Sequence, residues 1–481
     1  MKIRFLILIL FCVLIARAHG QRGRESPSDA RTALRTAVAA ELGGPLFARC
    51  LAAVEIADAR SGEILFSRNA ELLLRPASNV KLFTSAAAVL GLPTDFHFET
   101  RLGAKDSTLR ALVCVGGGDP LLTGQDIQKL VEMAYDAGVR TVDTLVMDGS
   151  LFADEMFGHG WMWDDEADPF MPYLGPFSLD GNAVTVTVQR GKDHAGAPVI
   201  STRPSSALFS FTQVERGRDG NDFRIERIPR SNAFLVSGQP RSASVRERFS
   251  IWRPQDLVAE RLLRECAQRG IVAGDAVIVF ADAPAELHVL GSIRRHIDEV
   301  LAVMNKRSDN LAAEMTLRAL VSGSGRKTAG ITGTDGIARR TATLAAHRLD
   351  SNAFALVDGS GISFYNLATA ASLGRLLRTL AAHAQFARFR SSLAIAGTDG
   401  TLRTRMAGVP DARGVQAKTG TVRGVSALSG YVQAPGGRLL TVVMFMQNFT
   451  GRHSPYRDAQ DRIMTHCLTY SAARRAVTPP R

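Results

Sequence analysis

The chain contains few cysteines and no closely spaced pair of them. Of the five cysteines in 481 residues, Cys12 lies in the apolar N-terminal segment. The other four are far apart in the sequence: Cys50, Cys114, Cys266 and Cys467. Because no C-x-x-C spacing occurs and the ten histidines show no metal-ligand spacing, we expect no metal site, no redox motif and no cofactor. The four cysteines either form up to two disulfides, in one of three pairings, or stay free and buried.

Long hydrophobic runs are absent after the N-terminus. Residues 1–20 combine a basic head, an apolar run over Phe5–Ala16 and the small residues of Ala18-His19-Gly20. This order is typical of a secretory signal peptide, and the run is too short for a stable membrane span. We therefore expect export to the periplasm or the exterior of the cell envelope.

Basic charge is in excess but is not gathered into long blocks. Lys and Arg number 58 against 46 Asp and Glu, which gives a net charge of +12. No base-reading motif and no basic–aromatic alternation accompanies this charge, so we expect no nucleic-acid partner. A basic surface suits attraction to an acidic polymer or an anionic envelope.

The distribution of helix and strand patterns divides the chain after residue 20 into different parts. Helical and strand patterns mix in its first and last parts, which predicts a discontinuous α/β (α+β) domain over residues 21–97 and 291–481. The middle is strand-rich and predicts a large insertion over residues 98–189 and 251–290. Residues 190–250 have the composition of a small β module within that insertion.

Several local patterns predict particular elements. Residues 51–66 and 425–446 each contain two strand-like runs separated by a Gly-containing turn, which predicts two β-hairpins. Ile293–Leu320 shows a helical period. Residues 21–40 are polar and charged, so we expect little order before Ala33-Leu34.

A loop rich in aromatic and acidic residues begins at Gly160-Trp161. Two tryptophans and three acidic residues, among them Asp165, are followed by Pro169, Pro172 and Pro176. This composition favours an exposed recognition segment, and a loop that caps the edge of a domain is the alternative.

The stretch Pro76–Lys81 leads into an alanine-rich apolar run that ends at Gly91-Leu92-Pro93. It predicts a helix that starts at or near Ser78, with Ser78 and Lys81 on one face of its first turn. A hydroxyl beside an amine in an apolar setting is a way to activate a nucleophile without histidine. Ser-x-x-Lys alone is a common pattern, and an N-cap serine next to a surface lysine is the structural alternative.

Two further short motifs follow in the chain. Ser308-Asp309-Asn310 precedes a helical pattern, and Lys418-Thr419-Gly420-Thr421 precedes a strand pattern. Ser-x-x-Lys, Ser-x-Asn and Lys-Thr-Gly, in this order, are the signature of penicillin-binding proteins and serine β-lactamases.

Longer stretches make the resemblance more specific; they are residues 116–121, 160–165, 304–311, 358–363 and 396–402. With these stretches, the chain resembles the D-alanyl-D-alanine carboxypeptidase/endopeptidase family of class C low-molecular-mass penicillin-binding proteins, of the penicillin-binding protein 4 type. The long gap between Lys81 and Ser308 is similar to that of this family. The resemblance implies a transpeptidase-like catalytic domain with a large inserted region. It also implies peptidoglycan stem peptides and cross-links as substrates and β-lactams as covalent inhibitors.

The resemblance also implies roles for individual residues. Ser78 would attack the carbonyl between two D-alanines, and Lys81, its pKa lowered by burial and neighbouring cations, would take the proton. Ser308 would relay that proton, and Asn310 would hold Lys81 or the substrate amide. The residues expected to bind the substrate are Lys418, Thr419, Gly420, Thr421 and, near the diamino acid, Asp165. Phe364 stands where relatives often have a basic residue, which leaves the preferred stem peptide open.

Other functions use the same three motifs. A serine β-lactamase and a D-amino-acid esterase or amidase are the enzymatic alternatives, and the gap after Lys81 argues against them. The third alternative is a wall-binding protein without catalytic activity, and the intact motif residues argue against it. The Asp358-Gly359-Ser360-Gly361 stretch does not meet the Gly-x-Ser-x-Gly pattern of a nucleophile elbow, so it predicts a tight structural turn. The oligomeric state stays open.

Overall fold

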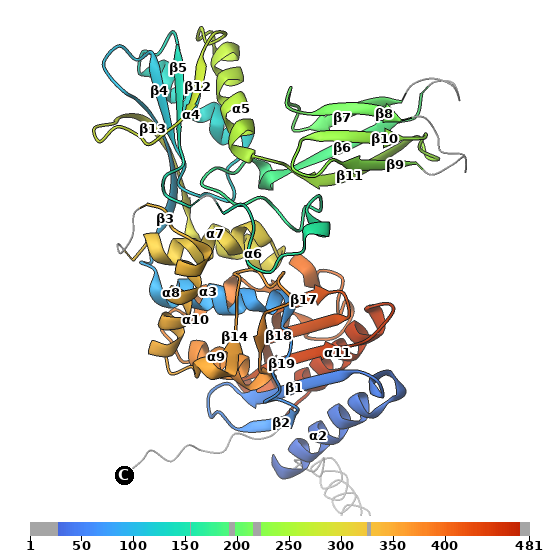
Figure 1. Ribbon diagram of the computed structural model, residues 1–481. Helices are drawn as coiled ribbons and strands as arrows, with labels where there is room; N and C mark the ends of the chain where they lie inside the picture. Colours follow the sequence, from blue (N-terminus) through green and yellow to red (C-terminus); the bar gives the residue numbers. More distant parts are fainter. Residues whose placement is uncertain (1–26, 154, 192–197, 215–222, 325–328, 472–481) are drawn as a thin grey trace, which may run out of the picture.

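The computed structural model describes residues 27–153, 155–191, 198–214, 223–324 and 329–471. The expected signal peptide, residues 1–20, lies outside them. In the described part of the chain, no helix has the length and apolar character needed to cross a membrane. Figure 1 shows a larger part of the molecule built on one sheet and its flanking helices, and an extension formed by the middle of the chain.

A six-stranded antiparallel sheet joins the two ends of the chain. Its strand order is β16-β17-β18-β19-β1-β2. Strands β1 and β19 pair from Leu51↔Gln447 to Asp58↔Leu440, so the N-terminal strand lies beside the C-terminal one. The strands are β1 Leu51–Asp58, β2 Ile64–Arg68, β16 Ala394–Ile395, β17 Val415–Val422, β18 Val425–Ala434 and β19 Arg438–Gln447. Both predicted hairpins are confirmed by this pairing.

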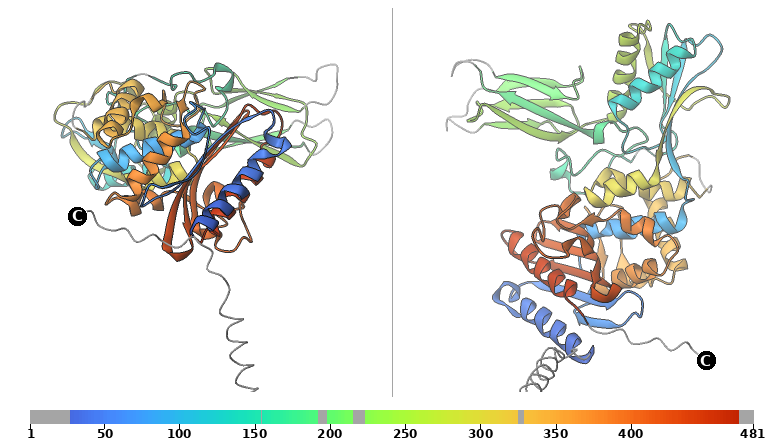
Figure 2. Two further views of the ribbon diagram at one scale, coloured as in Figure 1. Left: turned by 90° about the horizontal axis from the view of Figure 1, so that it is seen from below. Right: turned by 180° about the vertical axis from the view of Figure 1, so that it is seen from behind.

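Both faces of this sheet are covered, because apolar side chains alternate between two cores. On β19, Val442, Met444 and Met446 enter one core, and Val443 and Phe445 enter the other. The first core is closed by α2 (Pro27–Gly43) and α11 (Ser454–Leu468), which lie side by side in Figure 2. The second is closed by α3 Val80–Gly91, α6 Ile297–Lys306, α7 Asn310–Ser322, α8 Gly333–Ala346, α9 Ala370–Ala381 and α10 Phe386–Ser391. A short pair, β14 Phe354–Ala355 and β15 Leu367–Ala368, lies near these helices.

Two local expectations were wrong in part. Helix α2 starts at Pro27, well before Ala33-Leu34, because Ala30, Leu34, Val38 and Leu42 form an apolar face that packs into the first core. The period over Ile293–Leu320 is interrupted. Strand β13 continues to His296, and a turn separates α6 from α7. That turn has a positive φ at Ser308, of 63°, which ends one helix before the next begins.

The middle of the chain leaves and rejoins the larger part through two paired strands. Strands β3 and β13 are antiparallel, with His97 opposite His296. They belong to a five-stranded mixed sheet of order β12-β5-β4-β3-β13, packed with α4 (Gly124–Asp136) and α5 (Pro254–Arg269). Its strands are β3 His97–Ala104, β4 Ala111–Val115, β5 Thr144–Asp148, β12 Val277–Phe280 and β13 His288–His296.

Two three-stranded sheets, β11-β6-β7 and β8-β10-β9, lie to one side of α5 in Figure 1. Here they are together called the β module. Phe209, Phe234 and Phe249 pack between them. The strands are β6 Ala183–Gln189, β7 Val199–Arg203, β8 Ser210–Val214, β9 Arg224–Arg227, β10 Ala233–Ser237 and β11 Ser244–Ser250.

The four cysteines of the described chain are free thiols. Cys114, Cys266 and Cys467 are buried, and Cys50 is partly exposed. Burial raises the pKa of the Cys266 thiol to about 11 and that of Cys467 to about 12, so neither forms thiolate at neutral pH. Of the two alternatives that the sequence left open, the structure has the free thiols.

We expect a thiol reagent to modify at most Cys50 in the native protein, because the other three are buried and protonated. After unfolding in denaturant without reductant, the same reagent is expected to modify all four. Peptide mass analysis after labelling measures both states. A disulfide-linked pair of peptides from the non-reduced protein would contradict the structure.

Candidate active site

Ser78 lies in a short turn that the chain holds in a strained conformation. The turn, η2 (Ala77–Asn79), runs directly into α3, so the regular helix starts two residues later than the sequence predicted. Ala77 has a φ of 48°, which is unfavourable for a residue with a side chain. Gly361 packs against this turn: a Cβ there would lie 2.0 Å from the Ala77 carbonyl oxygen. Only glycine allows the Asp358–Gly361 loop to approach the nucleophile turn this closely.

The Lys81 side chain is fully buried and makes three hydrogen bonds. Its Nζ donates to Ser78 Oγ at 3.1 Å, to Asn310 Oδ1 at 2.6 Å and to the Ser360 carbonyl oxygen at 2.7 Å. Burial lowers the pKa of Lys81 to about 8, while carboxylates, chiefly Asp358, act in the opposite direction. The expected neighbouring cations are not among the causes of this pKa shift; burial is.

A second hydroxyl–amine pair lies beside the first. Lys418, on β17, is fully buried, and its Nζ donates to Ser308 Oγ and to the Thr419 carbonyl oxygen, each at 2.8 Å. Burial, and then the nearby charge of Lys81, hold the pKa of Lys418 well below its usual value. Ser308 occupies the turn between α6 and α7, where Asp309 caps α7 through its bond from the Ala312 N–H.

The rest of the Lys418–Thr421 segment lies against the nucleophile turn. A Cβ at Gly420 would lie 2.8 Å from the Pro76 carbonyl oxygen and 2.9 Å from Asn79 Nδ2, so glycine lets β17 pack against this turn. Asn79 is fully buried and donates to the Lys418 carbonyl oxygen at 3.3 Å. Pairing between β16 and β17 ends at Ala417, which leaves the following edge of β17 without a strand partner in the described chain.

Thr419 and Thr421 differ in their surroundings. Thr419 Oγ1 donates to Thr401 Oγ1 at 2.8 Å, which ties the motif to the 396–402 stretch. Thr421 is exposed, and its Oγ1 accepts from Arg457 Nη2 at 3.4 Å.

Buried charges support the loop that binds Lys81. Asp358, 1% exposed, accepts from the N–H groups of Gly361 and Ser363, both at 2.8 Å. Asn366 Nδ2 and Trp161 Nε1 also donate to it, at 2.9 and 3.2 Å. The result is the tight structural turn that the sequence predicted for this stretch.

Glu314 and Arg340 complete the support from the opposite side. Glu314 Oε1 accepts from the Gly359 N–H at 2.9 Å. Arg340, fully buried, donates to the carbonyl oxygens of Asp358 and Leu356 at 2.6 and 2.8 Å. Sequence reasoning missed Asn79, Glu314 and Arg340, because a charged or amide side chain within a helix pattern gives no sign that it is buried.

Asp165 stands apart from the other predicted site residues. It is exposed, at the end of η3 (Trp163–Asp165), and the structure describes no hydrogen bond or ion pair of its carboxylate. Partial burial, then Asp164 and Asp168, raise its pKa. Its loop nevertheless reaches the site, since Asn310 Nδ2 donates to the Phe170 carbonyl oxygen at 2.7 Å. At Phe364, the Arg75 guanidinium lies over the ring, 5.1 Å from its centroid, so a cation from another segment lies near this position.

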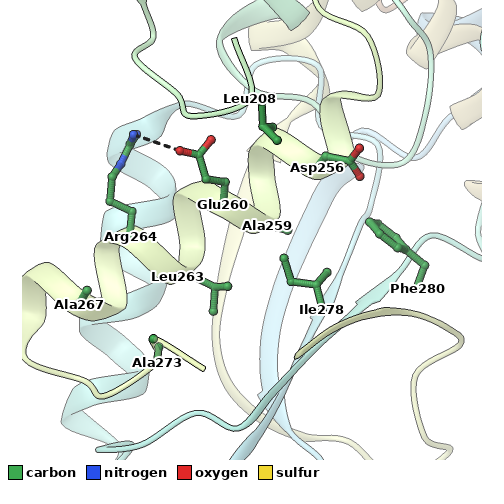
Figure 3. A pocket seen from close by; sticks show the side chains of 11 residues that line it. Leu208, Asp256, Ala259, Glu260, Leu263, Arg264, Ala267, Ala273, Ile278 and Phe280 are labelled. Atoms are coloured by element: carbon green, nitrogen blue, oxygen red, sulfur yellow. Dashed lines mark ion pairs between the residues drawn. The ribbon is translucent and has the colours of Figure 1, made fainter. Parts of the chain in front are cut away.

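One apolar cavity lies away from this site. It has a volume of about 550 Å³ and lies between α5, β12 and Leu208 (Figure 3). None of the predicted site residues lines it. In the described ranges, no three His, Cys, Asp or Glu side chains are placed to hold a metal ion.

Comparisons with known proteins show the family of this chain. The model of the D-Ala-D-Ala carboxypeptidase 3 (S13) family matches residues 34–467. A D-alanyl-D-alanine carboxypeptidase from Actinomadura sp. (strain R39) is 30% identical over 446 residues, 85% of this chain and 80% of the relative. The D-alanyl-D-alanine carboxypeptidase DacB of Haemophilus influenzae is 25% identical over 408 residues, 81% of this chain and 83% of the relative.

Solved structures show the same fold. The crystal structure of penicillin binding protein 4 (dacB) from Haemophilus influenzae aligns with a TM-score of 0.80 at 22% identity, over 90% of this chain and 99% of that chain. The same protein complexed with a β-lactam aligns with a TM-score of 0.74 over the same shares. Family model and relatives define a serine-type D-Ala-D-Ala carboxypeptidase. The chain belongs to the D-Ala-D-Ala carboxypeptidase 3 (S13) family, which confirms the resemblance found in the sequence.

We expect Asp358→Asn to lower the free energy of unfolding by about 3 kcal/mol, because an amide provides one acceptor oxygen where four donors converge. Denaturant unfolding followed by circular dichroism measures this change. The control is Asp143→Asn, which removes an exposed partner of Arg110 and is expected to leave stability unchanged. Equal stability of the two variants would contradict a supporting role for Asp358.

Proposed function

We propose that this enzyme hydrolyses the terminal D-Ala-D-Ala bond of peptidoglycan stem peptides through an ester on Ser78. The observation that carries the proposal is the bond between Ser78 Oγ and the buried amine of Lys81. A buried lysine with a pKa near 8 is neutral in a useful fraction of molecules at neutral pH, so it can accept the serine proton.

Acylation begins when Ser78 Oγ attacks the carbonyl carbon and its proton passes to Lys81 Nζ. The oxyanion that forms is expected between the backbone N–H groups of Ser78 and Thr421, a role carried over from relatives. As the C–N bond breaks, Ser308 relays the proton held by Lys81 to the leaving amine of D-alanine, and Lys81 becomes neutral again. Water then attacks the ester and gives its proton to Lys81, which returns it to Ser78 Oγ as the shortened peptide leaves.

Substrate binding is assigned to the open edge of β17. An extended peptide can add to the strand beyond Ala417, and the Thr419 hydroxyl and the Lys418 cation suit its terminal carboxylate. The bond from Lys418 to Ser308 gives this lysine a second task, which is to orient the hydroxyl that relays the proton. We propose that two charged groups bind the side chain of the diamino acid. They are Asp165 and Arg75, whose guanidinium lies over the Phe364 ring.

The wider assignment follows from the same site. We propose that the enzyme works in the periplasm or at the cell-envelope exterior after removal of residues 1–20, and that β-lactams acylate Ser78. The proposed division is a catalytic domain, residues 21–97 and 291–481, an inserted domain, residues 98–189 and 251–290, and a module, residues 190–250. Because strand β6 (Ala183–Gln189) pairs with β7 and β11, we propose to move the start of the module from residue 190 to Ala183.

A fluorescent penicillin is expected to label the native enzyme covalently, and Ser78→Ala is expected to abolish the label. Ser85→Ala is the matched control: Ser85 lies about two turns after Ser78 and bonds only the backbone carbonyls of Lys81 and Leu82, so labelling should persist. Gel fluorescence and intact mass measure the ester. Absence of label on the wild-type enzyme would exclude the serine-acyl mechanism, and rapid turnover of the antibiotic would favour a β-lactamase.

Purified muropeptides separate the two peptidase activities. Monomeric pentapeptides are expected to lose one alanine, which mass analysis detects directly. Release of monomers from cross-linked dimers would add endopeptidase activity on the same serine. Wild-type protein that forms the penicillin ester and leaves both muropeptides intact would favour a wall-binding protein that has lost its hydrolase activity.

The rate of acylation is expected to rise with pH and to level off above about pH 8. Lys81 must be neutral to accept the proton, and its pKa of about 8 means that the protonated form dominates below this value. Stopped-flow measurement of the second-order rate with the fluorescent penicillin between pH 5.5 and about 9.5 gives the midpoint. A rate that does not change across this range would contradict the assignment of Lys81 as the base.

A further inference from the structure

The aromatic–acidic loop contacts two distant parts of the molecule. Here the bridging loop means residues 160–174. On one side it contacts the catalytic part through the bonds Asn310 Nδ2 to Phe170 O and Trp161 Nε1 to Asp358. Gly160 also packs tightly there, since a Cβ would lie 2.5 Å from Ser363 Oγ and from the Tyr365 ring.

On its other side the bridging loop is held by the β module, through Glu166. The Glu166 carboxylate accepts from Arg227 Nη2 at 3.1 Å, from the Arg230 N–H at 2.6 Å and from the Tyr173 hydroxyl. Its backbone carbonyl accepts from Arg227 Nη2 at 3.1 Å and from Ser250 Oγ at 2.6 Å. Arg227 ends β9 and Ser250 ends β11, so both sheets of the module take part. In Figure 1 this loop runs between the module and the catalytic part.

The ion pair at the centre of these contacts is largely shielded from solvent. The Arg227 side chain is 0% exposed and that of Glu166 is 12% exposed. Burial alone would raise the pKa of Glu166, but the hydrogen bonds from Tyr173, Arg230 and Arg227 hold it below its usual value. Loss of one partner leaves a buried charge without compensation, so this contact has one strongly preferred geometry.

We propose that Arg227 and Glu166 are positioning residues for the reaction. They fix the bridging loop so that the Phe170 carbonyl holds the Asn310 amide, whose Oδ1 in turn accepts from Lys81 at 2.6 Å. This inference rests on the proposed function, because it assumes that Lys81 activates Ser78. If Arg227 and Glu166 act in this way, the β module contributes to acylation by holding the bridging loop.

The alternative is that the ion pair only stabilises the module. The two cases differ in acylation kinetics. A purely structural defect lowers the fraction of molecules that become labelled at completion. A positioning defect lowers the acylation rate constant of the molecules that are folded, while the labelled fraction at completion stays near one.

The test compares Arg227→Met with Arg261→Met in the full-length enzyme. Arg261 also pairs with a buried carboxylate, Glu265, at 2.7 Å, but on α5 and without a described contact to the bridging loop. The rate constant for fluorescent penicillin is expected to fall about tenfold or more in Arg227→Met and to change less than about twofold in Arg261→Met. Arg227→Lys, which restores a cation, is expected to recover part of the rate. Circular dichroism melting reports the stability of each variant.

A milder variant keeps the test decisive if Arg227→Met does not fold. Tyr173→Phe removes one hydroxyl donor to Glu166 and retains the buried ring, so the rate constant is expected to fall by about two- to fivefold. If Arg227→Met folds and acylates at the wild-type rate, the inference is overturned. If Arg227→Met does not fold, a wild-type rate in Tyr173→Phe overturns it. In both cases the proposed formation of an ester on Ser78 would still stand. A wild-type enzyme that takes no label would instead overturn the proposed function.

Discussion

The buried amine of Lys81 is the contact on which the arrangement of the site depends. A lysine amine that is buried away from water needs hydrogen-bond acceptors from the protein. The three acceptors of Lys81 come from separate segments: the Ser78 turn, the start of α7 and the Asp358–Gly361 loop. These segments are brought together because removing any acceptor would leave a buried donor unsatisfied. The same burial that imposes this requirement lowers the pKa of the amine to about 8. Position and basicity therefore have one physical cause.

Support for this amine extends outward in layers. Asp358, Glu314 and Arg340 hold the loop that carries the Ser360 carbonyl, and their charges are buried with it. In the opposite direction, Asn310 connects the site to the bridging loop and, through Glu166, to the β module. The insertion is thus linked to the chemistry by named hydrogen bonds as well as by the paired strands β3 and β13.

Much of the fold could be read from sequence patterns, since short apolar runs bounded by turn residues, such as those of β18 and β19, predict strands. Errors occurred where tertiary contacts override a local pattern. The helical period over Ile293–Leu320 includes the end of β13 and the Ser308 turn, because pairing with β3 and a positive φ decide those residues. The start of helix α2 was predicted too late, because the helix face that packs against α11 contains only a few apolar residues.

The sequence by itself determined the three motifs, their order and the residue types, because a hydroxyl, an amine and an amide belong to Ser78, Lys81 and Asn310 in any surroundings. It also determined the family, since the stretches around these motifs are specific in composition. Only the tertiary structure decided that Lys418 contacts Ser308, that Gly420 and Gly361 are needed for close packing, and that Glu166 joins the module to the loop. These contacts join residues far apart in the chain, and burial, which no single residue encodes, gives them their strength.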